Sequence, residues 1–279
     1  MVYVIKNLSK KLTFLFILLN ALQIAGCSSG KNADLLAAQQ KVEPADTVYN
    51  EALANFDAGR YKQAALKFSV VETQHPLTEW ARKSLIMQVY SNFKGANYTE
   101  AVNAASRYLV QYNKTKDAPY INYLMGLSYF HQIPSITYDQ SNSEETIKAM
   151  QNLITNYPSS PYIEDAKDKI RFAKNQLAEK EMRVGRDYQQ HNDYVAALKR
   201  YRYVLEHYKD TNLTEEALYR CVEVNETLGL SVEARTATYI LGYNYPNSSW
   251  YKIAYNLLQK SNVAMTTNKD SWLYKVFAK

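Results

Sequence analysis

The sequence contains few cysteine, histidine, glycine and proline residues. Among 279 residues there are 2 cysteines, 4 histidines, 8 glycines and 7 prolines. No spacing of the histidines suits zinc, and no glycine-rich phosphate loop occurs. Paired carboxylates such as Glu144 with Glu145 fall at expected helix starts, where negative charge favours the helix dipole. The sequence therefore predicts no metal, no cofactor and no catalytic site.

Scarce helix breakers also point to the fold class. Alanine, leucine, tyrosine and lysine are abundant, and no sustained alternation of apolar and polar residues appears. These residues favour helices, and the missing period of two argues against strands. The sequence predicts an all-α protein.

The N-terminus has the three parts of an export signal. Lys6, Lys10 and Lys11 precede an apolar run from Leu12 to about Leu22, and Ile24-Ala25-Gly26-Cys27 follows. The run is shorter than the roughly 20 residues needed to span a bilayer. We therefore expect residues 1–26 to be a cleaved signal peptide.

Charge gives little reason to expect a nucleic-acid partner. The chain has 33 basic and 27 acidic residues, and removal of the signal peptide leaves 30 against 27. The apparent basicity is thus largely an export feature. Residues 27–44 are polar with small side chains, which predicts a flexible tether ahead of the fold.

Segments of similar pattern recur along the remaining chain. Ala64 and Ala101 lie 37 residues apart, as do Ala197 and Ala234. This period is near the 34 residues of tetratricopeptide repeats, whose small residue lets two antiparallel helices approach closely. We predict a tetratricopeptide-like solenoid of about five helix-turn-helix units and a terminal helix. The expected units are 45–78, 79–116, 117–160, 161–212 and 213–248, with the last helix at 249–259.

These units group into larger parts. Residues 45–160 would hold repeats 1–3, residues 161–260 would hold repeats 4–5 with the final helix, and 261–279 is a tail without a predicted structure. Matching Pro158 to the closing proline of the repeat requires about eight extra residues in the third unit, and we place this insertion within residues 131–143. An insertion in a repeat array maps to a surface loop, which is either functional or merely tolerated.

The first helices of the units supply the positions that line the groove of a tetratricopeptide array. In the first three units these positions are mostly aromatic, which suits an extended peptide with an aromatic terminus. The alternative is that these rings pack between helices as core. The predicted groove residues are Tyr49, Leu53, Phe56, Ile86, Tyr90, Phe93, Tyr120, Tyr123, Leu127 and Phe130.

The corresponding positions of the last two units are polar. They include Met182, Arg186, Gln189, Gln190, Tyr219, Glu223 and Glu226. This end suits a folded partner, and we predict Arg186, Arg200 and Arg202 as contacts because arginine provides several rigid donors. The competing interpretation of each arginine is a solvated basic surface.

Several motifs together resemble the BamD family of outer-membrane lipoproteins. Residues 24–27 match the bacterial lipobox, and the resemblance extends from about Thr47 to Trp250. Residues 139–144 and the Tyr208-Lys209 pair depart from the family pattern. The other segments that match the family pattern are Tyr123-Leu124-Met125-Gly126-Leu127, the acidic loop leading to Ala149, residues 157–162, residues 165–169, residues 177–181 and Val184.

The lipobox resemblance implies a lipid anchor. Cys27 would carry a thioether-linked diacylglycerol and an N-acyl chain such as palmitate, its only covalent additions. Ser28 in place of aspartate implies sorting to the outer membrane, facing the periplasm. Three acyl chains exceed the two signals needed for stable anchoring.

The family resemblance also implies a non-catalytic scaffold of the barrel assembly machinery. Its partners would be the periplasmic POTRA domains of BamA, other Bam lipoproteins and unfolded β-barrel precursors. Two alternatives stay open. One is another periplasmic repeat lipoprotein, such as a pilus-secretin pilotin or a cell-wall-synthesis adaptor, and the other is an enzyme on a helical scaffold, such as a wall hydrolase.

Overall fold

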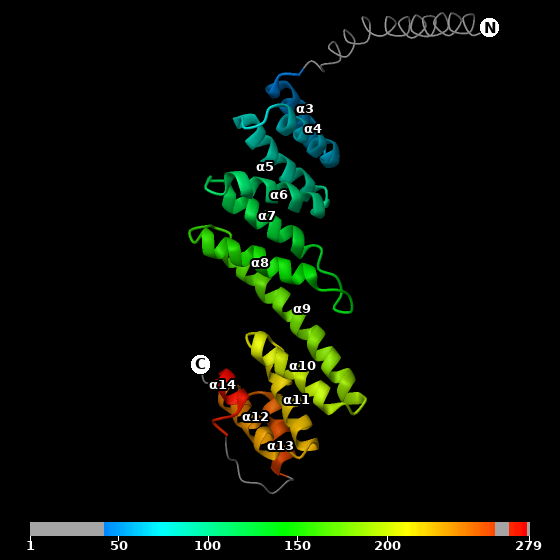
Figure 1. The fold of residues 1–279 in the computed structure, drawn as a ribbon, viewed down its shortest axis with the longest axis vertical. Coiled ribbons are helices and arrows are strands. Elements are labelled where there is room, and N and C mark those ends of the chain that lie inside the picture. The colour runs from blue at the N-terminus through cyan, green and yellow to red at the C-terminus, as the bar shows by residue number, and fades with distance from the viewer. Residues whose placement is uncertain (1–41, 260–267, 278–279) are drawn as a thin grey trace, which may run out of the picture. The chain divides into compact units, whose positions relative to one another are not determined.

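The computed structural model describes residues 42–259 and 268–277 (Figure 1). Cys27, most of the predicted tether and the tail residues 260–267 and 278–279 lie outside the described residues. Within the described ranges the regular elements are all helices: α3 (Ala45–Asp57), α4 (Tyr61–Gln74), α5 (Glu79–Lys94), α6 (Tyr98–Tyr112), α7 (Ala118–Phe130), α8 (Ser141–Asn156), α9 (Ile163–Gln190), α10 (Tyr194–His207), α11 (Thr214–Thr227), α12 (Ser231–Asn244), α13 (Ser249–Gln259) and α14 (Trp272–Phe277).

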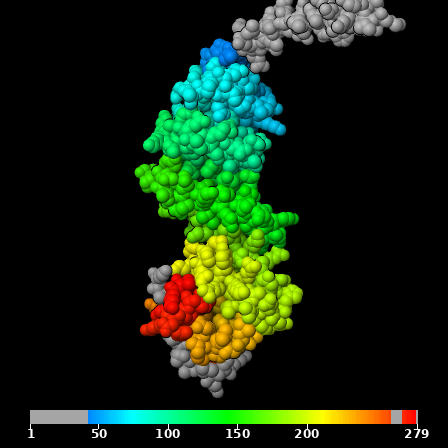
Figure 2. Space-filling model, viewed as in Figure 1, coloured from blue at the N-terminus to red at the C-terminus, as the bar shows by residue number. Residues whose placement is uncertain are grey.

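The predicted fold class is confirmed. Five helix pairs, α3–α4 to α11–α12, are followed by α13, and residues 48–279 form one unit. Within this unit each helix from α4 to α12 packs on the next. Surface colours in Figure 2 accordingly follow chain order from cyan to green in the N-terminal pairs. The short helix α14, which falls in the tail without a predicted structure, packs on α10 and α12.

The turn inside four of the five helix pairs has the same backbone geometry. One residue adopts a positive φ, and the N–H of the next residue donates to the carbonyl five residues earlier, at 2.8 to 2.9 Å. This is the Schellman bond, which satisfies a carbonyl at the end of a helix. The positive-φ residues are Gly59, Ala96, Asn192 and Gly229. The third pair has the longer link 131–140 in place of this turn.

Caps and prolines explain other helix starts. Thr78 accepts a hydrogen bond from the N–H of Ala81 at 3.1 Å, and Asp193 accepts one from Ala196 at 3.2 Å. Each side chain satisfies one of the free N–H groups at a helix start. Pro119 lies in the first turn of α7, where no N–H donor is needed.

Small residues set the spacing between paired helices, as the repeat pattern predicts. Ala64, Ala101, Ala197 and Ala234 are fully buried. Gly185 has the same role in the fourth pair, because a Cβ there would lie 2.5 Å from Cε1 of the buried Tyr201. Close packing at these positions leaves no room for a larger side chain.

Helix α9 joins the two halves of the unit. It has 28 residues; Ala166 packs in a cluster with Met150 and Leu153, whereas Ala178 and Met182 belong to the large core around α10–α13. One continuous helix therefore contributes to two cores. Met182, expected to line the groove, is fully buried instead.

Candidate docking surfaces on the helix pairs

A row of aromatic rings follows the first helices of the N-terminal pairs. Phe56 and Tyr90 have ring centroids 5.3 Å apart, and Tyr90 and Tyr120 are 6.4 Å apart. Tyr162 continues the row by contacting Tyr120 at 5.6 Å and stacking on Tyr123 at 4.6 Å. Rings at these separations gain from edge and offset contacts beyond their burial.

The predicted groove residues share one exposure class. All ten are half-buried, being neither core residues nor fully exposed. Each of these side chains is therefore partly packed and partly accessible to solvent. This arrangement accommodates both interpretations, packing between helices and contact with a ligand, so the groove stays a prediction.

Polar contacts fix the ring of Tyr123, which stacks on Tyr162 in the row. The hydroxyl of Tyr123 on α7 donates to Asp165 Oδ2 on α9 at 2.7 Å, and Lys169 Nζ lies 3.1 Å from Asp165 Oδ1. Burial and this hydrogen bond raise the pKa of Tyr123. Burial alone would raise the pKa of Asp165, but the bonds from Tyr123 and Lys169 lower it. Burial also raises the pKa of Tyr120 to about 12, so both rings stay neutral near pH 7.

Three rings that contact the predicted groove residues were missed by the sequence reasoning: Trp80, Tyr162 and Phe172. Trp80, at the start of α5, has its ring centroid 5.2 Å from that of Tyr49. Tyr162 lies just before α9 and is part of the motif 157–162. Neither Trp80 nor Tyr162 occupies a groove position of the repeat pattern, because both lie at helix starts. Phe172 on α9 also contacts Phe130 at 5.1 Å.

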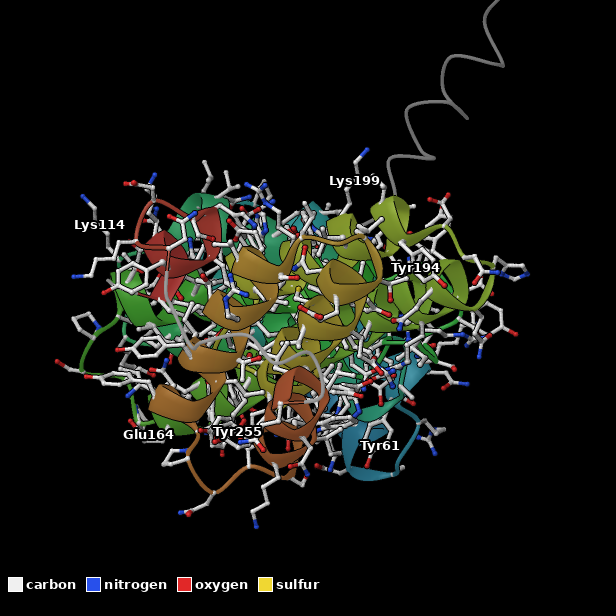
Figure 3. All side chains as sticks on the ribbon, turned by 90° about the horizontal axis from the view of Figure 1, so that it is seen from below. Tyr61, Lys114, Glu164, Tyr194, Lys199 and Tyr255 are labelled. Carbon is white, nitrogen blue, oxygen red and sulfur yellow. The ribbon has the colours of Figure 1, made fainter. Side chains whose placement is uncertain are left out.

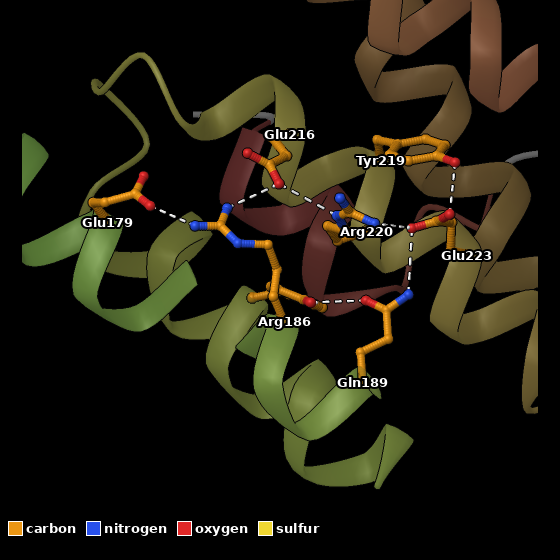
Figure 4. Close-up of polar contacts among 8 residues, drawn as sticks. Glu179, Arg186, Gln189, Glu216, Tyr219, Arg220 and Glu223 are labelled. Carbon is orange, nitrogen blue, oxygen red and sulfur yellow. Dashed lines mark hydrogen bonds and ion pairs between the residues drawn. The ribbon is translucent and has the colours of Figure 1, made fainter. Parts of the chain in front are cut away.

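The C-terminal half carries a connected set of charged side chains between α9 and α11 (Figure 4). Arg186 Nη1 lies 2.9 Å from Glu216 Oε1, and its Nη2 contacts Glu179. Arg220 binds Glu216 at 3.3 Å and Glu223 at 2.8 Å. We call Glu179, Arg186, Gln189, Glu216, Tyr219, Arg220 and Glu223 the α9–α11 network.

The α9–α11 network alters the expected role of Arg186. Burial alone would lower the pKa of Arg186, but the carboxylates of Glu216 and Glu179 raise it. Its side chain is 29% exposed, so only part of the guanidinium faces solvent. The structure thus places a predicted partner contact in an internal pair of charge-assisted hydrogen bonds.

The other two predicted arginines also have partners within the chain. Arg200 Nη1 lies 3.0 Å from Glu181 Oε2, which raises the pKa of Arg200. Arg202 pairs with Glu206 at 2.8 Å and its guanidinium lies 4.5 Å from the ring centre of Trp272 on α14. Figure 2 shows α14 against the surface of α10. Both side chains keep more than 40% exposure, so their contact role stays a prediction.

The described residues contain no arrangement typical of metal binding and no membrane span. No group of three or more histidine, cysteine, aspartate or glutamate side chains is gathered there as metal ligands. Nor is any helix within residues 42–259 and 268–277 both long and apolar enough to cross a bilayer.

Fold and surfaces together define a tetratricopeptide-like repeat protein with two chemically different surfaces, one aromatic and one charged. Residues 41–240 match the model of the YfiO family, described as outer membrane lipoprotein, and the chain belongs to this family.

Curated relatives extend the match over most of the chain. The chain is 35% identical to the outer membrane protein assembly factor BamD of Caulobacter vibrioides, over 87% of this chain and 79% of that protein. It is 37% identical to BamD of Rickettsia prowazekii, over 91% of this chain and 98% of that protein. A solved TPR2AB domain of yeast Sti1, in a complex described as pHSP90, aligns with a TM-score of 0.38 and 15% identity over 78% of this chain and 84% of that one.

Proposed function

We propose that this protein is a non-catalytic scaffold of the barrel assembly machinery, anchored in the outer membrane by lipid on Cys27. In this proposal the C-terminal half holds the periplasmic POTRA domains of BamA. The aromatic groove receives unfolded β-barrel precursors, and the other Bam lipoproteins complete the assembly. No cofactor takes part.

The observation that carries the proposal is the chemical contrast between the two halves. Half-buried rings line the first helices up to Phe130, whereas α9 and α11 present arginines and glutamates. Open aromatic edges suit apolar and aromatic side chains of an unfolded segment. Charged groups held in fixed geometry suit a folded partner with complementary charge, because they give specificity. Membership of an outer membrane lipoprotein family supports the location.

The first experiment is a pulldown with epitope-tagged protein from detergent-solubilised membranes, followed by mass spectrometry. Recovery of BamA with its lipoproteins is the expected result. Recovery of secretin or wall-synthesis proteins without BamA would reject the assembly role and leave another lipoprotein adaptor. A clearing band of the purified protein in a peptidoglycan zymogram would contradict the non-catalytic role.

Residue-level tests use neighbouring side chains as controls. Arg200→Ala should lower recovery of BamA, whereas Lys199→Ala should not, because Lys199 extends outward from the adjacent position of α10 (Figure 3). For the groove, Tyr90→Ala should weaken binding of an unfolded barrel precursor. Tyr138→Ala is the matched control because Tyr138 is 67% exposed outside the groove.

The proposed lipid anchor on Cys27 can be tested separately. Cys27→Ala should leave the protein in the soluble fraction after export, because the acyl chains supply the membrane affinity. Metabolic labelling with an alkyne fatty acid should mark the parent protein but not this variant. Unchanged membrane retention and labelling of the variant would reject the lipid site.

A further inference from the structure

A hollow lies between α6, α7 and α8. It has a volume of about 570 Å³, within the range of ligand pockets, and all three helices supply its lining. On α7 the lining residues Asn122, Met125 and Tyr129 are set apart from Tyr120 and Tyr123 by the 100° turn per residue of a helix. The hollow is therefore separate from the aromatic groove.

A buried amide is part of the polar lining of this hollow. Asn122 is only 1% exposed, and its Nδ2 donates to Asn152 Oδ1 at 2.5 Å. The Oδ1 atom of Asn122 is buried without a hydrogen-bond partner. A buried acceptor without a donor is unfavourable. Asn122 thus contributes an unpartnered acceptor to the wall of the hollow, and a ligand donor reaches it only after a small shift of the side chain.

Helix α8 adds a regular row of polar side chains. Lys148, Asn152 and Asn156 line the hollow at intervals of four residues, so they lie on one face of the helix. The row is about 12 Å long at 1.5 Å per residue, which matches three to four residues of extended chain. An amide side chain both donates and accepts, as a peptide backbone does.

The remaining lining defines what else the ligand carries. Leu109 and Met125 provide half-buried apolar surface. Lys114 and Lys148 are at the rim, where Lys114 extends outward from the ribbon (Figure 3). Glu145 is the one acidic lining residue and lies 3.6 Å from Lys148. Two lysines against one glutamate favour a ligand with a carboxylate.

We infer that this hollow binds an extended peptide segment of a partner protein. The peptide backbone pairs with Asn122 and Asn152, one apolar side chain packs on Leu109 and Met125, and an acidic side chain or C-terminal carboxylate approaches the lysines. The site uses none of the residues assigned to precursor or BamA binding, so it stands apart from the proposed function.

To test this inference, a phage library of random heptapeptides is panned on the full mature protein in detergent. Peptides retained by the parent protein are counter-selected against Asn152→Ala and then measured by fluorescence anisotropy. Asn152 is exposed, but its replacement also removes the acceptor of the buried Asn122 amide, so Asn152→Ala and Asn122→Leu are both used only if their circular dichroism is unchanged. Asn103→Ala, at an exposed position of α6 outside the hollow, is the matched control.

The expected result is a set of apolar and acidic peptides whose affinity drops roughly 5- to 10-fold with Asn152→Ala, the effect of one hydrogen bond. N-methylation of a central peptide amide should give a similar loss, whereas Asn103→Ala should give none. Failure to obtain any peptide that distinguishes the parent from Asn152→Ala would overturn the inference. Displacement of the selected peptides by an N-acetylglucosamine tetrasaccharide at lower concentration would also overturn it, because the hollow would then be a sugar site.

Discussion

The α9–α11 network makes a quantitative prediction about Arg186. Arg186→Met keeps an unbranched apolar stem but removes the bonds to Glu216 and Glu179. The Glu216 side chain is 16% exposed, so its bond is a half-buried charge-assisted one, worth about 1.5–3 kcal/mol. The bond to the more exposed Glu179 adds at most about 1 kcal/mol. We expect a loss of about 2 kcal/mol in the free energy of unfolding.

Thermal unfolding followed by circular dichroism at 222 nm measures this loss. For a unit of this size, about 2 kcal/mol corresponds to a Tm lower by about 4–8 °C. Glu216→Gln should also lower Tm, and the double variant should lose less than the sum because both changes remove the same bond. Arg183→Met is the control, because Arg183 is an exposed arginine of the same helix and should change Tm by less than about 2 °C.

Other outcomes of these measurements would give Arg186 a different role. If Arg186→Met leaves Tm unchanged but lowers BamA recovery, the internal bonds contribute little and the residue serves a partner. If both quantities fall together, and Glu216→Gln lowers both as well, the network acts by holding α9 against α11. Additive losses in the double variant would refute the coupling argued from the geometry.

Three further predictions concern turns and titrating groups. In urea titrations, Gly59→Ala should lower the free energy of unfolding by about 1 kcal/mol, and Ala96→Gly should raise it by up to about 1 kcal/mol. Both residues have a positive φ, which favours glycine, and a Cβ at Gly59 would meet no atom within 4 Å, so backbone strain alone sets the effect. Equal effects of the two changes would contradict this. The folded pKa of Tyr120 lies above the usual 10, at about 12, so its contribution to stability is complete below pH 10 and is lost as pH rises through about 12. Because the chain has 25 tyrosines, the test is the difference in absorbance at 295 nm between the parent protein and Tyr120→Phe. This difference should appear near pH 12, and a difference near pH 10 in the folded protein would refute the assignment. Cys221 is fully buried, which raises the pKa of its thiol, so the folded protein should react with a thiol reagent at pH 8 only after denaturant is added.

The repeat architecture was predictable because it depends on local patterns. Buried alanines at a period of 37 residues identified the close approach of paired helices, and these alanines are fully buried. The turns inside the helix pairs show why the repeat has no invariant glycine at this position. Ala96 and Asn192 adopt the same positive φ as Gly59 and Gly229. Asparagine tolerates this conformation, and alanine adopts it at a cost, so the geometry recurs without an invariant glycine.

The roles of individual polar residues were less predictable because they depend on distant pairing. Arg186 bonds with Glu179, seven residues before it, and with Glu216, thirty residues after it. Periodicity places Arg186 on a helix face but cannot identify the opposite side chain. Met182 was assigned to the groove from its position in the repeat, whereas α9 packs in two cores and buries this side chain. The six residues of α14 are too few to give a helical period.

Helix α9 links the predicted aromatic groove to the α9–α11 network as one continuous helix. Asp165 near its start bonds with Tyr123 of the groove, and Arg186 near its end bonds with Glu216 of the network. These two positions are separated by 21 residues, or about 31 Å of continuous helix. A continuous helix packed near both ends keeps these two positions at a fixed separation, whereas a flexible loop of equal length would not. A precursor bound at the rings and a partner bound at the charges would therefore be held at a fixed separation, which raises the effective concentration of one at the other.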